Sequence, residues 1–312
     1  MRQRIQLVGM VVVVALSPAG GERGWAQDAK VVEIDTLNVR DTLYHLSGGG
    51  ANALALIDEI NGGVVLIDAK LPGWGEAVRE AIRGVTDLPV TTIINTHGHP
   101  DHAGANGEFG PEVEIIAHEN TRTNMMKAGV AENALPTTTF ADRFTLLEGL
   151  DQIDLYYFGA GHTDGDIVVV FPEKGVAFLG DLLPLKAAPG IDTEHGGSGL
   201  EFPNTLAKAV AGIDGVTRVV TGKGPFPSTY AGRGRRETGE RRPWTGWVTW
   251  DDVAEYGDFT RDFLATVDEA FRAGTSVDAA AAALRLPDRY AAYGMDLARA
   301  NVEAIYNELA AR

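Results

Sequence analysis

The sequence contains no cysteine, which excludes disulfide bonds and thiolate metal ligands. Any metal site in this chain must therefore use histidine, aspartate or glutamate. Positive charge is also scarce, because 27 Lys and Arg stand against 43 Asp and Glu and leave a net charge of −16. An acidic surface repels a polyanion, so the composition argues against nucleic acid as the main partner.

Long apolar runs are missing as well. Leu7–Leu16 is apolar, but its ten residues are too few to span a bilayer. The run follows Arg2 and Arg4 and precedes small residues at Gly24 and Ala26, a pattern typical of a cleaved secretory signal peptide over residues 1–26. We therefore expect a periplasmic or secreted protein without membrane attachment after cleavage.

Short apolar runs alternate with glycine-rich turns through the first part of the chain, which predicts an α/β fold with two packed sheets and helices outside. The expected strands are 31–37, 41–46, 51–58, 63–68, 90–95, 113–117, 144–147, 152–158, 167–171, 176–179 and 218–221. The expected helices are 74–83, 118–127 and 204–212.

The C-terminal part has a helical pattern instead. Apolar residues recur every four positions at Phe259, Phe263, Val267 and Phe271. Thr275 followed by Asp278 predicts a capped helix start, and residues 298–309 predict a last helix. We interpret residues 257–312 as a helical appendage packed on the main domain.

Residues 222–256 are rich in Gly, Pro, Arg and Trp and separate the last expected strand from this appendage. A long segment of this kind is either functional or a surface insertion whose Trp residues pack on the tail. Its basic cluster includes Arg235 and Arg236, which we take as candidates for binding an anionic substrate group.

Histidine and aspartate gather where expected strands end. His97, His99, Asp101 and His102 follow the strand 90–95 within six residues. His162 lies between two later strands, and Asp181 follows another. Imidazole and carboxylate groups that converge from strand ends suit a zinc ion.

The order H-x-H-x-D-H, then G-H-T, then L-G-D, resembles the metallo-β-lactamase-fold superfamily over roughly residues 31–225. Asp68, at the end of Leu66-Ile67-Asp68, is similar to a supporting Asp of that superfamily. The resemblance implies an αββα sandwich of two mixed sheets with helices on the outer faces. It assigns residues 27–256 to that domain, and exported members with a helical tail are most similar.

The resemblance also implies two metal sites. The first zinc would be held by His97, His99 and His162, and the second by Asp101, His102, a bridging Asp181 and a later histidine. That last histidine is absent, because Lys223 occupies its place. A protonated lysine has no lone pair to donate to a metal. Either a second zinc binds weakly through the remaining ligands, or the ammonium replaces it, which we favour.

These features predict a zinc-dependent hydrolase of an ester, lactone, lactam or similar acyl bond. One firm zinc with water as its fourth ligand would supply hydroxide near neutral pH. Asp101 would orient that water or act as general base, and Lys223 would hold the carboxylates or bind substrate. The alternative is a non-catalytic or weakly active metal-binding member of the fold.

The remaining histidines have separate expected roles. His195 lies on a loop after Asp181 that we expect at the rim of the site, where it could contact substrate or supply a replacement ligand. His118 is expected to cap a helix or lie on the surface, and His45 to be structural.

Overall fold

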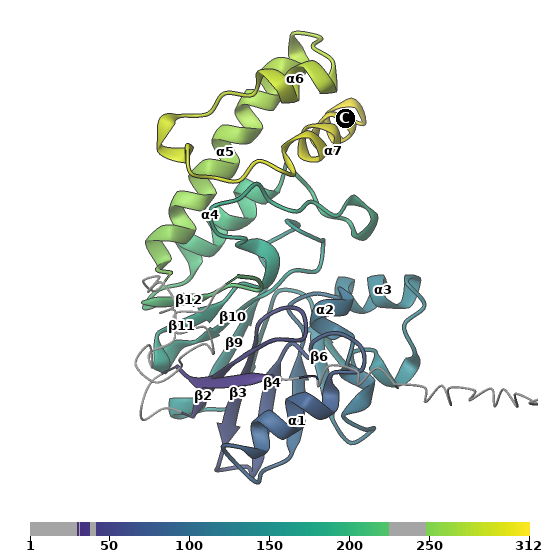
Figure 1. The fold of residues 1–312 in the computed structure, drawn as a ribbon, viewed down its shortest axis with the longest axis vertical. Coiled ribbons are helices and arrows are strands. Elements are labelled where there is room, and N and C mark those ends of the chain that lie inside the picture. Colours follow the sequence, from purple (N-terminus) through teal and green to yellow (C-terminus); the bar gives the residue numbers. More distant parts are fainter. Residues whose placement is uncertain (1–29, 31, 38–41, 225–247) are drawn as a thin grey trace, which may run out of the picture.

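The computed structural model describes residues 30, 32–37, 42–224 and 248–312 (Figure 1). The predicted signal segment 1–26 and the candidates Arg235 and Arg236 lie outside this part of the chain. Within it, no helix is both long enough and apolar enough to cross a bilayer.

Seven strands of the described chain form the first sheet, in sequence order. They are β1 (Glu33–Thr36), β2 (Leu43–Ser47), β3 (Ala53–Asp58), β4 (Gly63–Ile67), β5 (Val90–Ile94), β6 (Glu114–His118) and β7 (Thr138–Phe140). The first four pair antiparallel, and β4 to β7 pair parallel. The sheet is therefore mixed, and its parallel half delivers strand ends to one edge.

Five further strands of the described residues form the second sheet, in the order β12-β11-β10-β9-β8. They are β8 (Arg143–Leu146), β9 (Ile153–Tyr156), β10 (Val168–Phe171), β11 (Val176–Phe178) and β12 (Arg218–Val220). β8 to β11 pair antiparallel, whereas β12 pairs parallel to β11. Both sheets are thus mixed, as predicted.

Three apolar clusters define the layers. Residues of both sheets, such as Leu56 and Phe171, interdigitate in the central cluster. The outer face of the first sheet packs against α1 through residues such as Val78. The outer face of the second sheet packs against α4 and the C-terminal helices. The predicted αββα sandwich is therefore confirmed.

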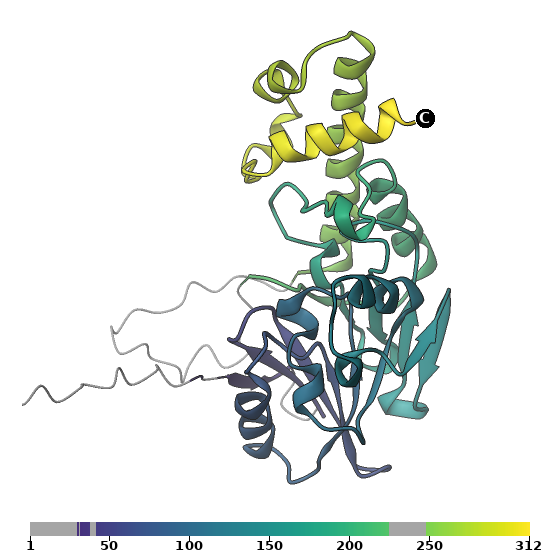
Figure 2. The same cartoon turned by 90° about the vertical axis from the view of Figure 1, so that its right-hand side faces the viewer.

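The helices have the following bounds: α1 (Gly75–Arg83), α2 (Pro100–Ala103), α3 (Glu119–Lys127), α4 (Phe202–Gly212), α5 (Trp250–Arg272), α6 (Val277–Ala283) and α7 (Ala298–Ala310). Figures 1 and 2 show α5, α6 and α7 together at one end of the molecule, beyond α4, with the C-terminus on α7. α5 begins seven residues before the predicted appendage, so the segment 222–256 ends inside a helix.

Several local predictions need correction. The N-cap of α6 is Ser276, not Thr275, because its hydroxyl accepts a hydrogen bond from the Ala279 N–H. α4 begins at Phe202, two residues earlier than expected. β7 and the one-turn helix α2 were not predicted, since elements this short carry no periodicity.

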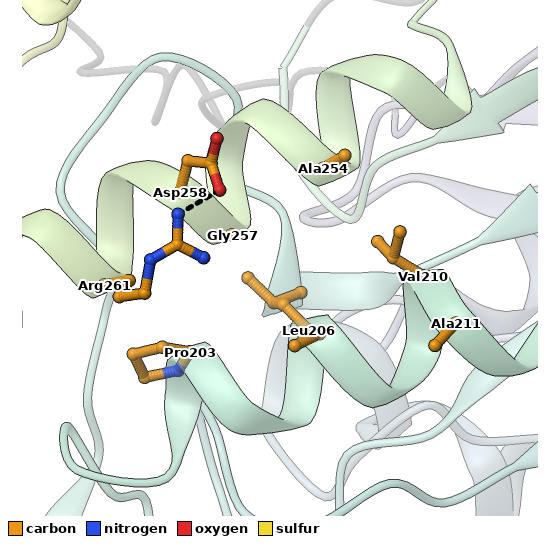
Figure 3. A pocket seen from close by; sticks show the side chains of 9 residues that line it. Pro203, Leu206, Val210, Ala211, Ala254, Gly257, Asp258 and Arg261 are labelled. Carbon is orange, nitrogen blue, oxygen red and sulfur yellow. Dashed lines mark hydrogen bonds and ion pairs between the residues drawn. The ribbon is translucent and has the colours of Figure 1, made fainter.

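A groove lies between α4 and α5 (Figure 3). Apolar residues such as Leu206 and Val210 line it, and the ion pair between Arg261 and Asp258 lies on the α5 side. None of the predicted site residues lines this groove, so it is separate from the histidine cluster.

Candidate metal centre

The candidate ligands all follow strand ends, as predicted. His97, His99 and His102 come after β5 and on α2, where Pro100 occupies the first helical position. His162 follows β9, and Asp181 lies in a short helical turn after β11. Strand ends at one edge of two facing sheets thus bring residues that are far apart in sequence to one place.

The first group consists of His97, His99 and His162. The Nδ1 atom of His99 lies 3.1 Å from Nε2 of His97 and 3.0 Å from Nε2 of His162. These three nitrogens form one of the clusters that could hold a metal ion. Three imidazole ligands leave a fourth tetrahedral position open, as in catalytic zinc sites.

The outward-facing nitrogens determine which lone pairs point inward. Nδ1 of His162 donates to the carbonyl oxygen of Gly190 at 2.8 Å, and Nε2 of His99 donates to Oδ2 of Asp192 at 2.7 Å. Nδ1 of His97 lies 3.2 Å from the Thr96 hydroxyl, whose own proton goes to Asp68. In the neutral imidazoles the three inward nitrogens therefore carry lone pairs. Lone pairs this close together fit a shared cation.

Burial keeps the rings of His97 and His162 neutral. It lowers the pKa of His162 to about 4 and, together with the neighbouring histidines, lowers the pKa of His97 well below its usual value. Neutral imidazole is the form that binds metal, so His97 and His162 need no proton release at neutral pH.

The second group contains His97, His102 and Asp181. Nδ1 of His102 donates to Oδ2 of the fully buried Asp68 at 2.7 Å, which turns Nε2 toward the carboxylates. Nε2 lies 3.3 Å from Oδ1 of Asp181 and 3.9 Å from Oδ2 of Asp101. Neither Nε2 of His102 nor Oδ1 of Asp181 has a hydrogen-bond partner among the described residues. Buried polar atoms without a hydrogen bond are uncommon, so they mark this pocket as part of a candidate functional site.

The charges of this group are coupled. Burial lowers the pKa of His102, but the carboxylates of Asp68 and Asp181 outweigh it and raise that pKa to about 10. Burial raises the pKa of Asp181, but His102, His162 and Lys223 together lower it below its usual range. The pocket therefore favours a carboxylate surrounded by positive charge.

Lys223 forms ion pairs with the carboxylates of both Asp181 and Asp101. Its Nζ lies 2.5 Å from Oδ2 of Asp181 and 3.1 Å from Oδ2 of Asp101. Burial alone would lower the pKa of Lys223, but the two carboxylates raise it, so the group is an ammonium. The resemblance implied that Lys223 stands in the place of the second site's last histidine; its role as a substitute for a metal stays a prediction.

Asn52 is a site residue that sequence analysis missed. Its backbone N–H donates to the Gly222 carbonyl at 2.7 Å. Its side-chain amide donates to the carbonyls of Thr221 at 2.9 Å and Gly224 at 3.3 Å. Asn52 therefore hydrogen-bonds the turn that contains Lys223 on both sides of that lysine. Its position after a glycine-rich turn gave no signal of a partner so distant in sequence.

Asp192 was also missed as a site residue, whereas His195 was named. Oδ2 of Asp192 accepts from His99 and, at 2.6 Å, from Nδ1 of His195. Burial raises the pKa of Asp192, but these two hydrogen bonds lower it to about 2. His195 thus shares the Asp192 carboxylate with Nε2 of His99. The contact of His195 with substrate stays a prediction. His118 caps α3 by accepting from the Asn120 N–H, as expected.

Comparisons with known proteins agree with this geometry. The 2,4-dinitroanisole O-demethylase subunit alpha of Nocardioides sp. (strain JS1661) is 30% identical over 148 residues, or 46% of this chain and 44% of that protein. A metallo-beta-lactamase type 2 of Bacteroides fragilis is 30% identical over 153 residues, or 47% of this chain and 60% of that protein. The chain thus spans less than two thirds of the length of either relative.

Solved structures share the fold. A metallo-beta-lactamase from Pontibacter korlensis superposes with a TM-score of 0.58 at 20% identity, over 74% of this chain and 99% of that chain. The metallo-beta-lactamase IND-7 gives a TM-score of 0.57 at 22% identity over the same shares. The sequence profile described as the metallo-beta-lactamase superfamily matches residues 47–212, which is more than half of the chain. The chain therefore belongs to the metallo-beta-lactamase superfamily.

Proposed function

We propose that the protein is a metal-dependent hydrolase with one firm zinc site, formed by His97, His99 and His162. The observation that carries the proposal is the convergence of three imidazole nitrogens, because Nδ1 of His99 lies 3.1 Å from Nε2 of His97 and 3.0 Å from Nε2 of His162. A zinc ion held there would activate a water molecule and polarise the bond to be cleaved. Two relatives named as metallo-beta-lactamases and one named as a hydroxyacylglutathione hydrolase support the same reaction class.

The residues around this group have separate roles in the proposal. Asp101 is partly exposed and would act as general base toward the attacking water. Lys223 takes the place of a second metal, because its ammonium neutralises Asp101 and Asp181 at hydrogen-bonding distance. Asp68 holds His102 in one orientation beneath them.

The proposed substrate carries an ester, lactone, lactam or similar acyl bond and an anionic group. Half of the Lys223 side chain remains exposed, at 53%, so the ammonium can also meet an anion from solvent. Arg235 and Arg236 would contribute to that recognition, and His195 would contact substrate beside His99. Export by the segment 1–26 is part of the same proposal.

Metal stoichiometry tests the role of Lys223. We expect about one tightly bound zinc per chain in the wild type and a rise toward two in Lys223→His, because imidazole restores a lone pair at the second position. Elemental analysis after equilibrium dialysis measures both values. Lys127→His, on the exposed end of α3, is the matched control and keeps one zinc. Two tightly bound zinc ions in the wild type would contradict the replacement of a metal by Lys223.

Turnover tests the reaction class. A panel of esters, lactones and β-lactams is assayed with wild type and with His99→Ala, which removes one of the three converging lone pairs. We expect wild-type hydrolysis of at least one acyl class and a loss of activity of 100-fold or more in the variant, about 2.7 kcal/mol or more in transition-state stabilisation. Tight zinc binding without turnover of any substrate would favour a non-catalytic metal-binding protein instead.

A further inference from the structure

The loop 186–199 supplies the outer hydrogen bonds of two candidate ligands. The Gly190 carbonyl accepts from Nδ1 of His162, and the Asp192 carboxylate accepts from Nε2 of His99. The Asp192 N–H also donates to the His162 carbonyl at 2.9 Å. Any shift of this loop therefore changes the direction in which both lone pairs point.

The C-terminal helices hold one end of this loop through a buried contact. Nδ2 of Asn301, a residue of α7 that is 2% exposed, donates to the Pro189 carbonyl at 2.9 Å. Pro189 immediately precedes Gly190, so a single peptide unit separates this contact from the acceptor of His162. The Tyr256 hydroxyl of α5 donates to the Ala187 carbonyl at 3.1 Å.

The same helices hold the other end of the loop through Glu308. Its Oε1 accepts from the Gly199 N–H at 2.7 Å, and its Oε2 accepts from the Ser198 hydroxyl at 2.5 Å. The Ser198 N–H in turn donates to the Gly161 carbonyl, next to His162. The packing is close, because a Cβ atom on Gly199 would lie 2.4 Å from Ile305 of α7.

Backbone pairing adds a third connection. The Ala188 N–H donates to the Gly294 carbonyl at 2.7 Å, and the Gly294 N–H donates to the Lys186 carbonyl at 2.9 Å. The segment between α6 and α7 thus forms an isolated bridge with the start of the loop. The loop thus forms hydrogen bonds at its start, at Pro189 beside Gly190, and at its end. Its partners in all three places belong to the C-terminal helices or to the segments that connect them.

We propose that the C-terminal helices position the first metal site, and that Asn301 and Glu308 are the positioning residues that do so through the loop 186–199. The inference rests on the proposed function only in that the group of His97, His99 and His162 binds a divalent metal. Neither residue touches the metal or the substrate. Outer partners of metal-binding histidines typically change metal affinity by 10- to 100-fold, because they set ring orientation and basicity.

The test measures zinc affinity by competition with a chromophoric chelator in the full-length chain. Glu308→Ala and Asn301→Ala are each expected to weaken zinc binding by about 10-fold. Glu308→Gln keeps one acceptor oxygen and is expected to recover part of the loss. Glu303→Ala is the matched control, because Glu303 lies on the same helix, is exposed and pairs with Arg299. Its zinc affinity is expected to equal that of the wild type.

A second readout distinguishes positioning from a loss of stability. Cobalt(II) replaces zinc, and its visible absorption reports the geometry of the three imidazoles. Shifted bands in Glu308→Gln, together with a far-ultraviolet circular dichroism spectrum equal to that of the wild type, support positioning even if Asn301→Ala does not fold. Wild-type affinity and an unchanged cobalt spectrum in both Glu308 variants would overturn the proposal, as would an equal loss in Glu303→Ala. A wild-type chain that binds neither metal would instead overturn the proposed function.

Discussion

At the scale of single residues, Lys70 is a lysine whose whole side chain is buried, close in the sequence to the candidate metal centre, two residues after Asp68. It is fully buried and adopts a positive φ of 73°. Its Nζ donates to the carbonyls of Leu46 at 2.7 Å and Ala51 at 2.5 Å, which flank the glycine turn 48–50. Burial lowers the pKa of Lys70 to about 7, although Asp68 acts in the opposite direction. Lys70 therefore stabilises the glycine turn that precedes Asn52. Asn52 in turn hydrogen-bonds the turn that contains Lys223.

The pKa of Lys70 predicts a pH-dependent stability. Between the folded value of about 7 and the ordinary value of 10.5, the unfolded chain binds a proton at Lys70 that the folded chain releases, so the contribution of Lys70 to the free energy of unfolding rises with pH. In Lys70→Met this contribution is absent. We expect the difference in the free energy of unfolding between wild type and variant to widen from pH 7 to pH 10, measured by urea denaturation.

The exposed Lys127→Met serves as the control for this experiment. It removes a lysine whose side chain remains in water, so its difference from the wild type is expected to stay constant over the same range. A constant difference for Lys70→Met as well would contradict the lowered pKa of the buried amine.

At the scale of elements, helix capping decides where the C-terminal part begins. The Thr249 hydroxyl accepts from the Asp252 N–H, and the Asp252 carboxylate accepts from the Thr249 N–H at 2.7 Å. This capping box starts α5 at Trp250. The periodicity of the phenylalanines alone predicted a start at residue 257, because it reports the buried face and not the cap.

The capping box gives a prediction for α5. Thr249→Ala removes the side-chain acceptor and is expected to lower the free energy of unfolding by about 1 kcal/mol. Thr249→Ser keeps the hydroxyl and is expected to retain most of that stability. Chemical denaturation followed by circular dichroism compares the three proteins. Equal stability of the Ala and Ser variants would show that the cap contributes nothing to the folded state.

At the scale of the whole molecule, the second sheet and the C-terminal helices share one core. Val170 of β10 and Leu206 of α4 belong to the same cluster as Phe259 of α5 and Val302 of α7. The tail therefore completes the outer helical layer of the sandwich. A shared apolar core makes independent unfolding of the two parts costly, because separation would expose both faces to water.

Metal binding is expected to stabilise this unit as a whole. Free zinc at a hundred times its dissociation constant should raise the free energy of unfolding by about 2.7 kcal/mol, since the converged histidines exist only in the folded state. Thermal unfolding is followed by far-ultraviolet circular dichroism and by tryptophan fluorescence, with zinc and with a chelator. We expect the two probes to shift together. Two separate transitions, or no shift with zinc, would contradict a single unit with a built metal site.

Much of the fold and of the candidate site could be predicted from local patterns. Buried strands such as β3 and β4 are continuous apolar runs, and the ligand-type residues follow strand ends. The sequence could not predict Asn52, Asp192, Asn301 or Glu308 as partners of the site. Each acts through hydrogen bonds to residues far away in the chain, and such contacts leave no periodic or motif signal.

The sequence by itself determined the fold class and the chemistry that is available, because the types of ligand and the apolar periodicity are properties of the local chain. Only the tertiary structure decided which nitrogen of each histidine faces inward and that Lys223 meets both Asp101 and Asp181. It also decided that the C-terminal helices hold the loop beside His162. These outcomes depend on distances between segments that only the packing of two sheets and their helices brings together.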